Sequence, residues 1–308
     1  MTRLATVDLG TNTIRLLVVE VESGRWRVLA QAQRITRLGQ GQGGVGALRA
    51  KPIERTVAAV AEFVATAERL GAAHVRIVAT SAVREAPNRE EFATRIHAAT
   101  GRRIEVVSGE EEARLTLLGV SAGLPHLGGS FLLVDIGGGS TEFVLAESGR
   151  ARAAASLRLG VVSLAERFID AGPVDPARYA AMTREIAGRL AGEMPPMVGA
   201  RRSSVLVGTA GTVTTLAALD LGLATYEADQ VHGHRLTRSA VERLRDRLGA
   251  LSLAARAGLP GLEPGRADVL IPGIAICLAT MEHFGFDALI VSDRGLREGL
   301  LCEILASP

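Results

Sequence analysis

Asp-Leu-Gly-Thr-Asn-Thr at residues 8–13 and Asp-Ile-Gly-Gly-Gly-Ser-Thr at residues 135–141 each end one run of apolar residues and lead into another. Both stretches join an acidic residue to a turn of small residues. Glycine lets a backbone turn sharply and lets its N–H groups approach a phosphate closely. An aspartate beside such a turn would repel phosphate unless a cation lay between them, so each stretch predicts phosphate together with a divalent metal. Two copies favour a duplicated phosphate site.

The predicted helices and strands repeat on either side of this duplication. The first half indicates strands at 4–9, 14–21 and 26–33, a helix at 52–70, a strand at 74–79, a helix at 89–99, a strand at 104–107 and a helix at 110–118. The second half indicates strands at 131–136, 142–146 and 151–158, helices at 161–169 and 176–193, a strand at 205–207, a helix at 212–219, a helix-rich region to 281, a strand at 288–291 and a helix at 296–305. This order predicts an α/β protein with a duplicated ribonuclease-H-like fold and a ligand cleft between its halves.

The glycine- and proline-containing stretch 119–129 is the natural domain boundary. We therefore expect an N-terminal domain at 1–124 and a C-terminal domain at 125–308, with the last helix free to pack back on the first domain.

Composition describes a packed globular protein and limits its partners. The chain has 308 residues, of which 47% are hydrophobic, and a formal net charge of +2, which does not single out nucleic acid. Cys277 and Cys302 lie apart, with no metal-binding spacing, as in reduced cytoplasmic proteins. The N-terminus shows no signal-peptide pattern, and no stretch reads as a membrane span. We expect a cytoplasmic protein without a nucleic-acid or membrane partner.

Three consecutive glutamates open the helix predicted near residue 110. Ser108 is a good N-cap, and Glu111 stands where a capping box needs its acidic partner. Successive side chains on a helix point about 100° apart, so three carboxylates cannot all face one cleft. Geometry alone leaves open which of Glu110, Glu111 and Glu112 is catalytic.

Three further segments carry polar groups. Residues 79–88 read either as a phosphate clamp that uses Ser81 and Arg84 or as a loop in which Asn88 caps the next helix. Residues 207–212 form a third glycine/threonine turn before a helix, suited to phosphate or to a plain connection. His232 and His234 have the wrong spacing for two metal ligands on one helix face.

Seven segments together resemble the exopolyphosphatase/guanosine pentaphosphate phosphohydrolase (Ppx/GppA) family in its short, two-domain form. They are residues 8–13 with Arg15, 79–82 with Arg84 and Asn88, 108–114, 135–142, 208–212, 232–234 and 295–299. The resemblance implies the fold of the actin, sugar kinase and Hsp70 superfamily. It also implies that Glu112, which directly precedes Ala113-Arg114, is the catalytic glutamate and that Glu142 is the second carboxylate of the reaction centre.

The resemblance further implies a phosphate site between the two turns. Its phosphate-binding residues are Gly10, Thr11, Asn12, Thr13, Arg15, Ser81, Arg84, Gly137, Gly138, Gly139, Ser140, Thr141, Gly208, Thr209, Gly211 and Thr212. Asp8 and Asp135 are expected to hold Mg²⁺, with Mn²⁺ as a substitute. Glu112 is expected to orient or deprotonate the attacking water with help from Glu142.

The expected activity is the release of terminal phosphate from inorganic polyphosphate by a homodimer. Hydrolysis of pppGpp to ppGpp is the second interpretation, and one chain can perform both. An ATP-dependent sugar or acetate kinase shares the fold, but kinase chemistry does not explain the segment around Glu112. A non-catalytic sensor of polyphosphate or ppGpp is the remaining alternative, and the intact carboxylates argue against it.

Overall fold

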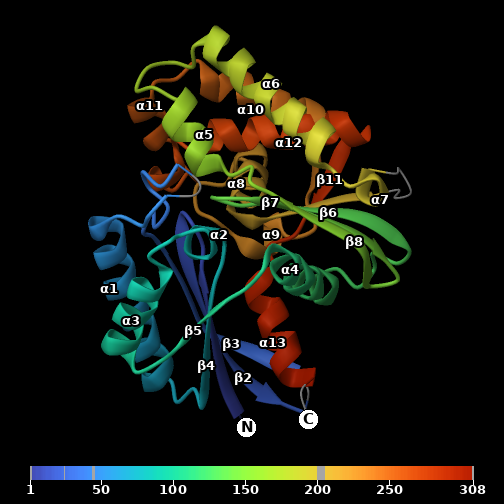
Figure 1. Cartoon of the computed structure of the whole chain (residues 1–308). Coiled ribbons are helices and arrows are strands. Elements are labelled where there is room, and N and C mark those ends of the chain that lie inside the picture. Colours follow the sequence, from blue (N-terminus) through green and yellow to red (C-terminus); the bar gives the residue numbers. More distant parts are fainter. Residues whose placement is uncertain (1, 24, 44–45, 200–204, 307–308) are drawn as a thin grey trace.

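The computed structural model describes residues 2–23, 25–43, 46–199 and 205–306 and contains two mixed sheets, one in each half of the molecule (Figure 1). The first sheet contains β1 (Thr2–Leu9), β2 (Thr13–Glu22), β3 (Arg25–Ile35), β4 (His74–Ala79) and β5 (Ile104–Val106). The second contains β6 (Ser130–Ile136), β7 (Thr141–Glu147), β8 (Arg150–Leu157), β9 (Val205–Thr209), β10 (Arg235–Thr237) and β11 (Ala288–Val291).

The two sheets share one strand order. The first runs β3-β2-β1-β4-β5, and the second runs β8-β7-β6-β9-β11 with β10 added at its edge. In both, the first three strands are antiparallel and the following ones are parallel to the central strand, β1 or β6. The duplicated fold predicted from the sequence is confirmed.

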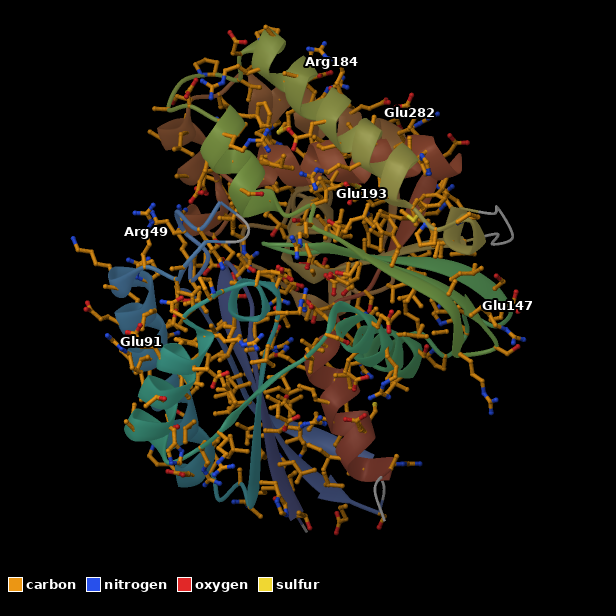
Figure 2. The ribbon with its side chains drawn as sticks, in the orientation of Figure 1. Arg49, Glu91, Glu147, Arg184, Glu193 and Glu282 are labelled. Carbon is orange, nitrogen blue, oxygen red and sulfur yellow. The ribbon has the colours of Figure 1, made fainter. Side chains whose placement is uncertain are left out.

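Helices cover the sheets and complete two apolar cores. The first half holds α1 (Ala50–Arg69), α2 (Ser81–Arg84), α3 (Arg89–Thr100) and α4 (Gly109–Gly123). The second holds α5 (Val161–Phe168), α6 (Pro176–Glu193), α7 (Pro196–Gly199), α8 (Ala210–Asp220), α9 (Ala228–Val231), α10 (Arg238–Gly249), α11 (Leu253–Ala257), the 3₁₀ helix η1 (Pro264–Arg266), α12 (Leu270–Phe284) and α13 (Leu296–Ala306). Charged side chains such as Glu91, Arg184 and Glu282 lie on the outside (Figure 2). No helix among the described residues is long and apolar enough to cross a membrane.

Asn88 does not cap α3 with its side chain, so that interpretation of the 79–88 segment is wrong. Its amide instead accepts a hydrogen bond from the Leu48 backbone N–H at 2.9 Å and donates one to the Leu48 carbonyl at 3.1 Å. A side chain occupied by this distant loop is not available to the helix that follows it.

The helices α4 and α13 cross between the halves, and each packs against the sheet of the other half (Figure 1). The apolar face of α4 joins a cluster with β6 and β7, whereas Leu301 of α13 packs against β1 and β2. The predicted boundary at residue 124 falls between α4 and β6, and the division into two domains remains a prediction. The exchanged packing of α4 and α13 holds the two halves together.

The crossing brings the two helix backbones into direct contact. A Cβ atom built at Gly299 would lie 1.8 Å from the Leu115 carbonyl oxygen, and one at Gly119 would lie 1.9 Å from the Gly295 carbonyl oxygen. Real side chains never approach backbone atoms so closely, so glycine is required at both positions.

Gly299→Ala should therefore force α4 and α13 apart and lower the free energy of unfolding by about 3 kcal/mol. Urea denaturation measures this loss. The control is Gly188→Ala on α6, where an added Cβ meets nothing within 4 Å. That variant should gain up to about 1 kcal/mol from helix propensity. Equal stabilities of the two variants would contradict the close contact.

Candidate active site

The two glycine-rich turns have the same backbone structure. Each closes an antiparallel hairpin, β1–β2 in one half and β6–β7 in the other. In the first, the Gly10 N–H donates to the Thr13 carbonyl at 3.2 Å, and in the second the Gly137 N–H donates to the Ser140 carbonyl at 3.0 Å. The aspartate lies two residues before the first glycine in both. The predicted duplication therefore extends to the hydrogen bonding of the turns.

The turns of the two halves touch each other. A Cβ atom at Gly138 would lie 2.9 Å from the Asn12 backbone nitrogen. One at Gly139 would lie 2.5 Å from the Ser81 Oγ and 2.6 Å from the Thr11 Oγ1. Any side chain at these glycines would push the halves apart, so the glycines are needed for the approach as well as for the turn.

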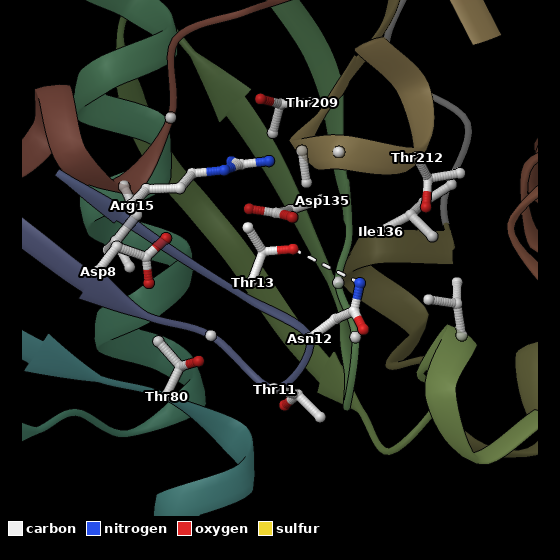
Figure 3. A pocket seen from close by; sticks show the side chains of 18 of the residues that line it. Asp8, Thr11, Asn12, Thr13, Arg15, Thr80, Asp135, Ile136, Thr209 and Thr212 are labelled. Atoms are coloured by element: carbon white, nitrogen blue, oxygen red, sulfur yellow. Dashed lines mark hydrogen bonds between the residues drawn. The ribbon is translucent and has the colours of Figure 1, made fainter. Parts of the chain in front are cut away.

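A cavity of about 100 Å³ lies where the turns meet (Figure 3). It is lined by sixteen of the predicted site residues, Asp8, Gly10, Thr11, Asn12, Thr13, Arg15, Ser81, Glu112, Asp135, Gly137, Gly138, Gly139, Ser140, Thr209, Gly211 and Thr212. Four predicted residues, Arg84, Thr141, Glu142 and Gly208, are not part of the lining. The structure thus brings most of the predicted site to one place.

Asp8 and Asp135 face the cavity from equivalent positions on β1 and β6, with Arg15 nearby (Figure 3). Burial raises the pKa of Asp135 to about 6, an effect that Arg15 opposes and Asp8 reinforces. Burial also raises the pKa of Asp8, against the influence of Arg15 and Arg297. Thr116 of α4 donates a hydrogen bond to Asp135 at 3.3 Å. Because both carboxylates are buried and their negative charges are unfavourable there, a cation bound between them would be favoured.

Glu112 is the glutamate that α4 presents to the cavity. Its side chain is buried, whereas Glu110 is exposed and Glu111 is ion-paired with Arg114. The Ser108 Oγ accepts from the Glu111 N–H at 3.1 Å, so the predicted N-cap is confirmed. Burial raises the pKa of Glu112 well above its usual value, and the charge of Glu142 adds to the effect.

Arg84 lies against Glu112 and not in the cavity. Its Nη1 donates to the Glu112 carboxylate at 2.8 Å and to the Val107 carbonyl at 3.1 Å. The guanidinium opposes the rise in the pKa of Glu112. This position fits a partner of the carboxylate better than the phosphate clamp expected from the sequence.

Glu142 lies behind the cavity on β7 and is buried. Burial and, to a smaller extent, the charge of Asp135 raise its pKa to about 7. Hydrogen bonds from Ser156 and Ser140 act in the opposite direction. Glu112 and Glu142 are therefore two interacting buried carboxylates, and the charge of Glu142 disfavours ionisation of Glu112.

The third turn joins β9 to α8 at the cavity. Ala210 has a positive φ of 69°, a conformation that costs about 1 kcal/mol outside glycine. A Cβ at Gly211 would lie 2.0 Å from Arg266 Nη1 and 3.0 Å from Arg15 Nη2. The left-handed conformation of Ala210 and the absence of a side chain at Gly211 thus allow Arg15 and Arg266 to pack against the start of α8.

Several cavity residues were not predicted from the sequence. Arg266 lies on η1, donates to Glu263 at 3.1 Å and to Gln33 at 3.2 Å, and belongs to none of the recognised segments. Arg297 and Glu298 lie at the start of the helix that the sequence predicts at 296–305, where no ligand role is predicted for them, and Glu298 accepts a hydrogen bond from the Gly295 N–H at 2.8 Å. Both nevertheless line the cavity.

Neither histidine of the 232–234 segment reaches the cavity. His232 accepts from the Asp293 N–H at 3.1 Å and contacts the Gly123 carbonyl at 3.0 Å. His234 pairs with Asp220. Within the described part of the chain, no three His, Cys, Asp or Glu side chains form a ready metal cage.

Comparison with known proteins identifies relatives over nearly the whole chain. The model of the Ppx/GppA phosphatase family matches residues 17–307. Exopolyphosphatase 2 of Mycobacterium tuberculosis is 36% identical over 316 residues, covering 97% of this chain and 98% of that protein. Exopolyphosphatase 1 of the same organism is 29% identical, covering 99% and 89%.

Solved structures agree with this match. The Ppx/GppA family member of Aquifex aeolicus is 34% identical, covers 99% of this chain and 98% of its own, and has a TM-score of 0.81. An exopolyphosphatase from Cytophaga hutchinsonii is 26% identical, with coverage of 99% and 98% and a TM-score of 0.92.

The raised pKa of Glu142 predicts that the unliganded protein is less stable at high pH. Between its ordinary value of 4.5 and about 7, the folded carboxyl holds a proton that the unfolded one has lost, so stability falls as pH rises through this window. Glu142→Gln cannot ionise and should gain about 2 kcal/mol over the parent between pH 5 and pH 8.

Urea unfolding in the presence of a chelator at pH 5, 6.5 and 8 measures this difference. Glu282→Gln, on the exposed surface of α12, is the control and should follow the parent at every pH. If the free energies of unfolding of the parent and of Glu142→Gln changed equally with pH, burial of the Glu142 carboxyl would not destabilise its ionised form.

Proposed function

Because the chain belongs to the Ppx/GppA phosphatase family and is a phosphoanhydride hydrolase, we propose that it is an exopolyphosphatase that releases terminal phosphate from inorganic polyphosphate. The observation that carries the proposal is the position of Glu112, a buried carboxylate at the edge of a cavity between two phosphate-type turns. A kinase needs an acceptor hydroxyl at this place, whereas a hydrolase needs only an oriented water.

The two turns would hold the terminal phosphoryl group. Residues 10–12 and 137–140 line the cavity together with Arg15, Arg266 and Arg297. The Gly10 and Gly137 N–H groups close the turns, so the other backbone N–H groups of the turns would bind the phosphoryl oxygens. Phosphoryl transfer depends mainly on positioning and on stabilising charge on the phosphoryl oxygens. Arginine forks are well suited to both tasks.

Asp8 and Asp135 would hold Mg²⁺, or Mn²⁺, together with the phosphate. Magnesium prefers oxygen ligands, keeps several waters and uses few carboxylates besides substrate phosphates. Two aspartates in one cavity fit this pattern, because no three acidic, histidine or cysteine side chains of the described residues are grouped to hold a metal by themselves. The raised pKa values of the two aspartates favour a positive charge beside them. When bound, the metal would neutralise charge on the phosphoryl oxygens.

Glu112 would accept a proton from the attacking water. Arg84 donates a hydrogen bond to this carboxylate and opposes the rise in its pKa, and the raised pKa makes Glu112 a better proton acceptor once it is ionised. A general base of this kind contributes about 10²–10⁴-fold to a rate.

Glu112→Gln should lower kcat for phosphate release from polyphosphate by about 10²–10⁴-fold, because the amide cannot take the proton. Its control is Glu111→Gln, one residue earlier on the same helix, where the side chain pairs with Arg114 outside the cavity. That variant should retain kcat within about twofold, since surface ion pairs contribute little. Near-normal turnover by Glu112→Gln would refute the assignment.

A second substrate, pppGpp, is favoured by a cavity of about 500 Å³ beside the first. The two cavities share Arg15 and Arg266. The second adds Tyr226, Gln31 and Gln33, an aromatic ring and two amides able to stack on a nucleobase and hydrogen-bond to its edge. Tyr226 donates its hydroxyl proton to Asp293 and keeps 43% of its surface exposed.

Tyr226→Ala should lower kcat/KM for pppGpp about tenfold, the value of one base–aromatic stacking contact, and leave short-chain polyphosphate within about twofold. Phosphate release from both substrates by the parent and the variant gives the comparison. Tyr179→Ala, on α6 away from both cavities, is the control. Equal effects on the two substrates would mean that this cavity does not distinguish them.

The proposal includes a homodimer in the cytoplasm. Cys277 and Cys302 are free thiols, as in proteins of reducing compartments. Membership of a phosphatase family argues against the kinase and sensor interpretations.

A further inference from the structure

Ser156 stands directly opposite Glu142 in the second sheet. The pairing of β7 with β8 sets Glu142 against Ser156, and the pairing of β6 with β7 sets Glu142 against Asp135. Directly opposed residues of neighbouring strands project from the same face of a sheet. Asp135, Glu142 and Ser156 therefore form one row across three strands, with Glu142 at its centre.

The hydroxyl of Ser156 is bonded to the buried carboxylate. Its Oγ donates to Glu142 Oε1 at 2.7 Å. Glu142 is only 2% exposed, whereas Ser156 is exposed, so the hydroxyl lies between the carboxylate and solvent. A buried carboxylate that loses one such donor keeps its desolvation cost and gains freedom to rotate.

Ser156 also packs against the helix that carries Glu112. A Cβ atom at Gly109, the first residue of α4, would lie 2.5 Å from Ser156 Cβ and 2.6 Å from its Oγ. Glu112 follows Gly109 by three residues, less than one helical turn. The same small side chain thus touches the strand residue Glu142 and the start of the helix that presents Glu112.

Arg158, the residue that follows the end of β8, has a related connection. Arg158 pairs with Glu85 at 2.6 Å, and Glu85 also accepts from Arg84 Nε at 3.4 Å. Arg84 is the partner of Glu112. The end of β8 therefore contacts both carboxylates of the reaction centre, one directly and one through two charged side chains.

We propose that Ser156 is a positioning residue for the hydrolysis, fixing the Glu142 carboxylate against the start of α4 so that Glu142 and Glu112 keep one relative orientation. The inference rests on the proposed roles of these two carboxylates. Serine meets both demands of the position, since it is small enough for the contact with Gly109 and supplies the donor for Glu142.

Ser156→Ala removes the donor without adding volume. We expect kcat for phosphate release from polyphosphate to fall about tenfold, the effect of losing one hydrogen bond to a charged group, while KM stays within about twofold. The matched control is Ser239→Ala, another exposed serine of the second half, whose hydroxyl is bonded to Thr237 at the start of α10. It should leave kcat and KM unchanged.

A double-mutant cycle distinguishes positioning from a general effect on packing. Ser156→Ala in a Glu142→Gln background should lower kcat no further, because the carboxylate that Ser156 orients is gone. A further tenfold loss in that background, or an unchanged kcat for Ser156→Ala in the parent, would overturn the inference. If Glu142→Gln itself leaves kcat unchanged, the proposed role of Glu142 fails, and the inference fails with it. Melting temperatures of all variants identify any loss of folded protein.

Discussion

The backbone contact between α4 and α13 is the constraint on which the site depends. The two helices pack antiparallel, with Gly299 against Leu115 and Gly119 against Gly295. Glu112 of α4 and residues 295–298 at the start of α13 line the cavity, and α8 begins there as well. The N-termini of α8 and α13 carry unpaired N–H groups and partial positive charge, so together they favour an anion. The helix contact, which reaches the cavity at Gly295, thus fixes α4 and with it the position of Glu112.

The carboxylates of the site are buried, which makes their ionised forms energetically unfavourable. Asp8, Asp135, Glu112 and Glu142 all have raised pKa values, and burial is the main cause for each. Arginines offset part of this cost, Arg15 for the aspartates and Arg84 for Glu112. Ionisation of these carboxylates is therefore unfavourable in the unliganded site, and a bound cation would offset that cost.

Local chemistry made much of this site predictable. The hairpin turns, the N-cap at Ser108 and the order of strands and helices along the chain follow from glycine placement and apolar periodicity, which act over a few residues. Arg84 shows where local reasoning ends, because its side chain could turn to phosphate or to Glu112 and only the packing of α4 decides. Arg266 and Tyr226 come from irregular segments near η1 and α9, which have no periodicity to indicate the direction of a side chain. Family resemblance selected Glu112 where geometry along one helix could not.

The crossing helices also have a consequence for folding. Each half of the chain ends in a helix that packs against the sheet of the other half. Each half has a core of its own, but neither covers all of its apolar surface without the helix from the other. The two halves are therefore expected to unfold together, and the active site lies where they join.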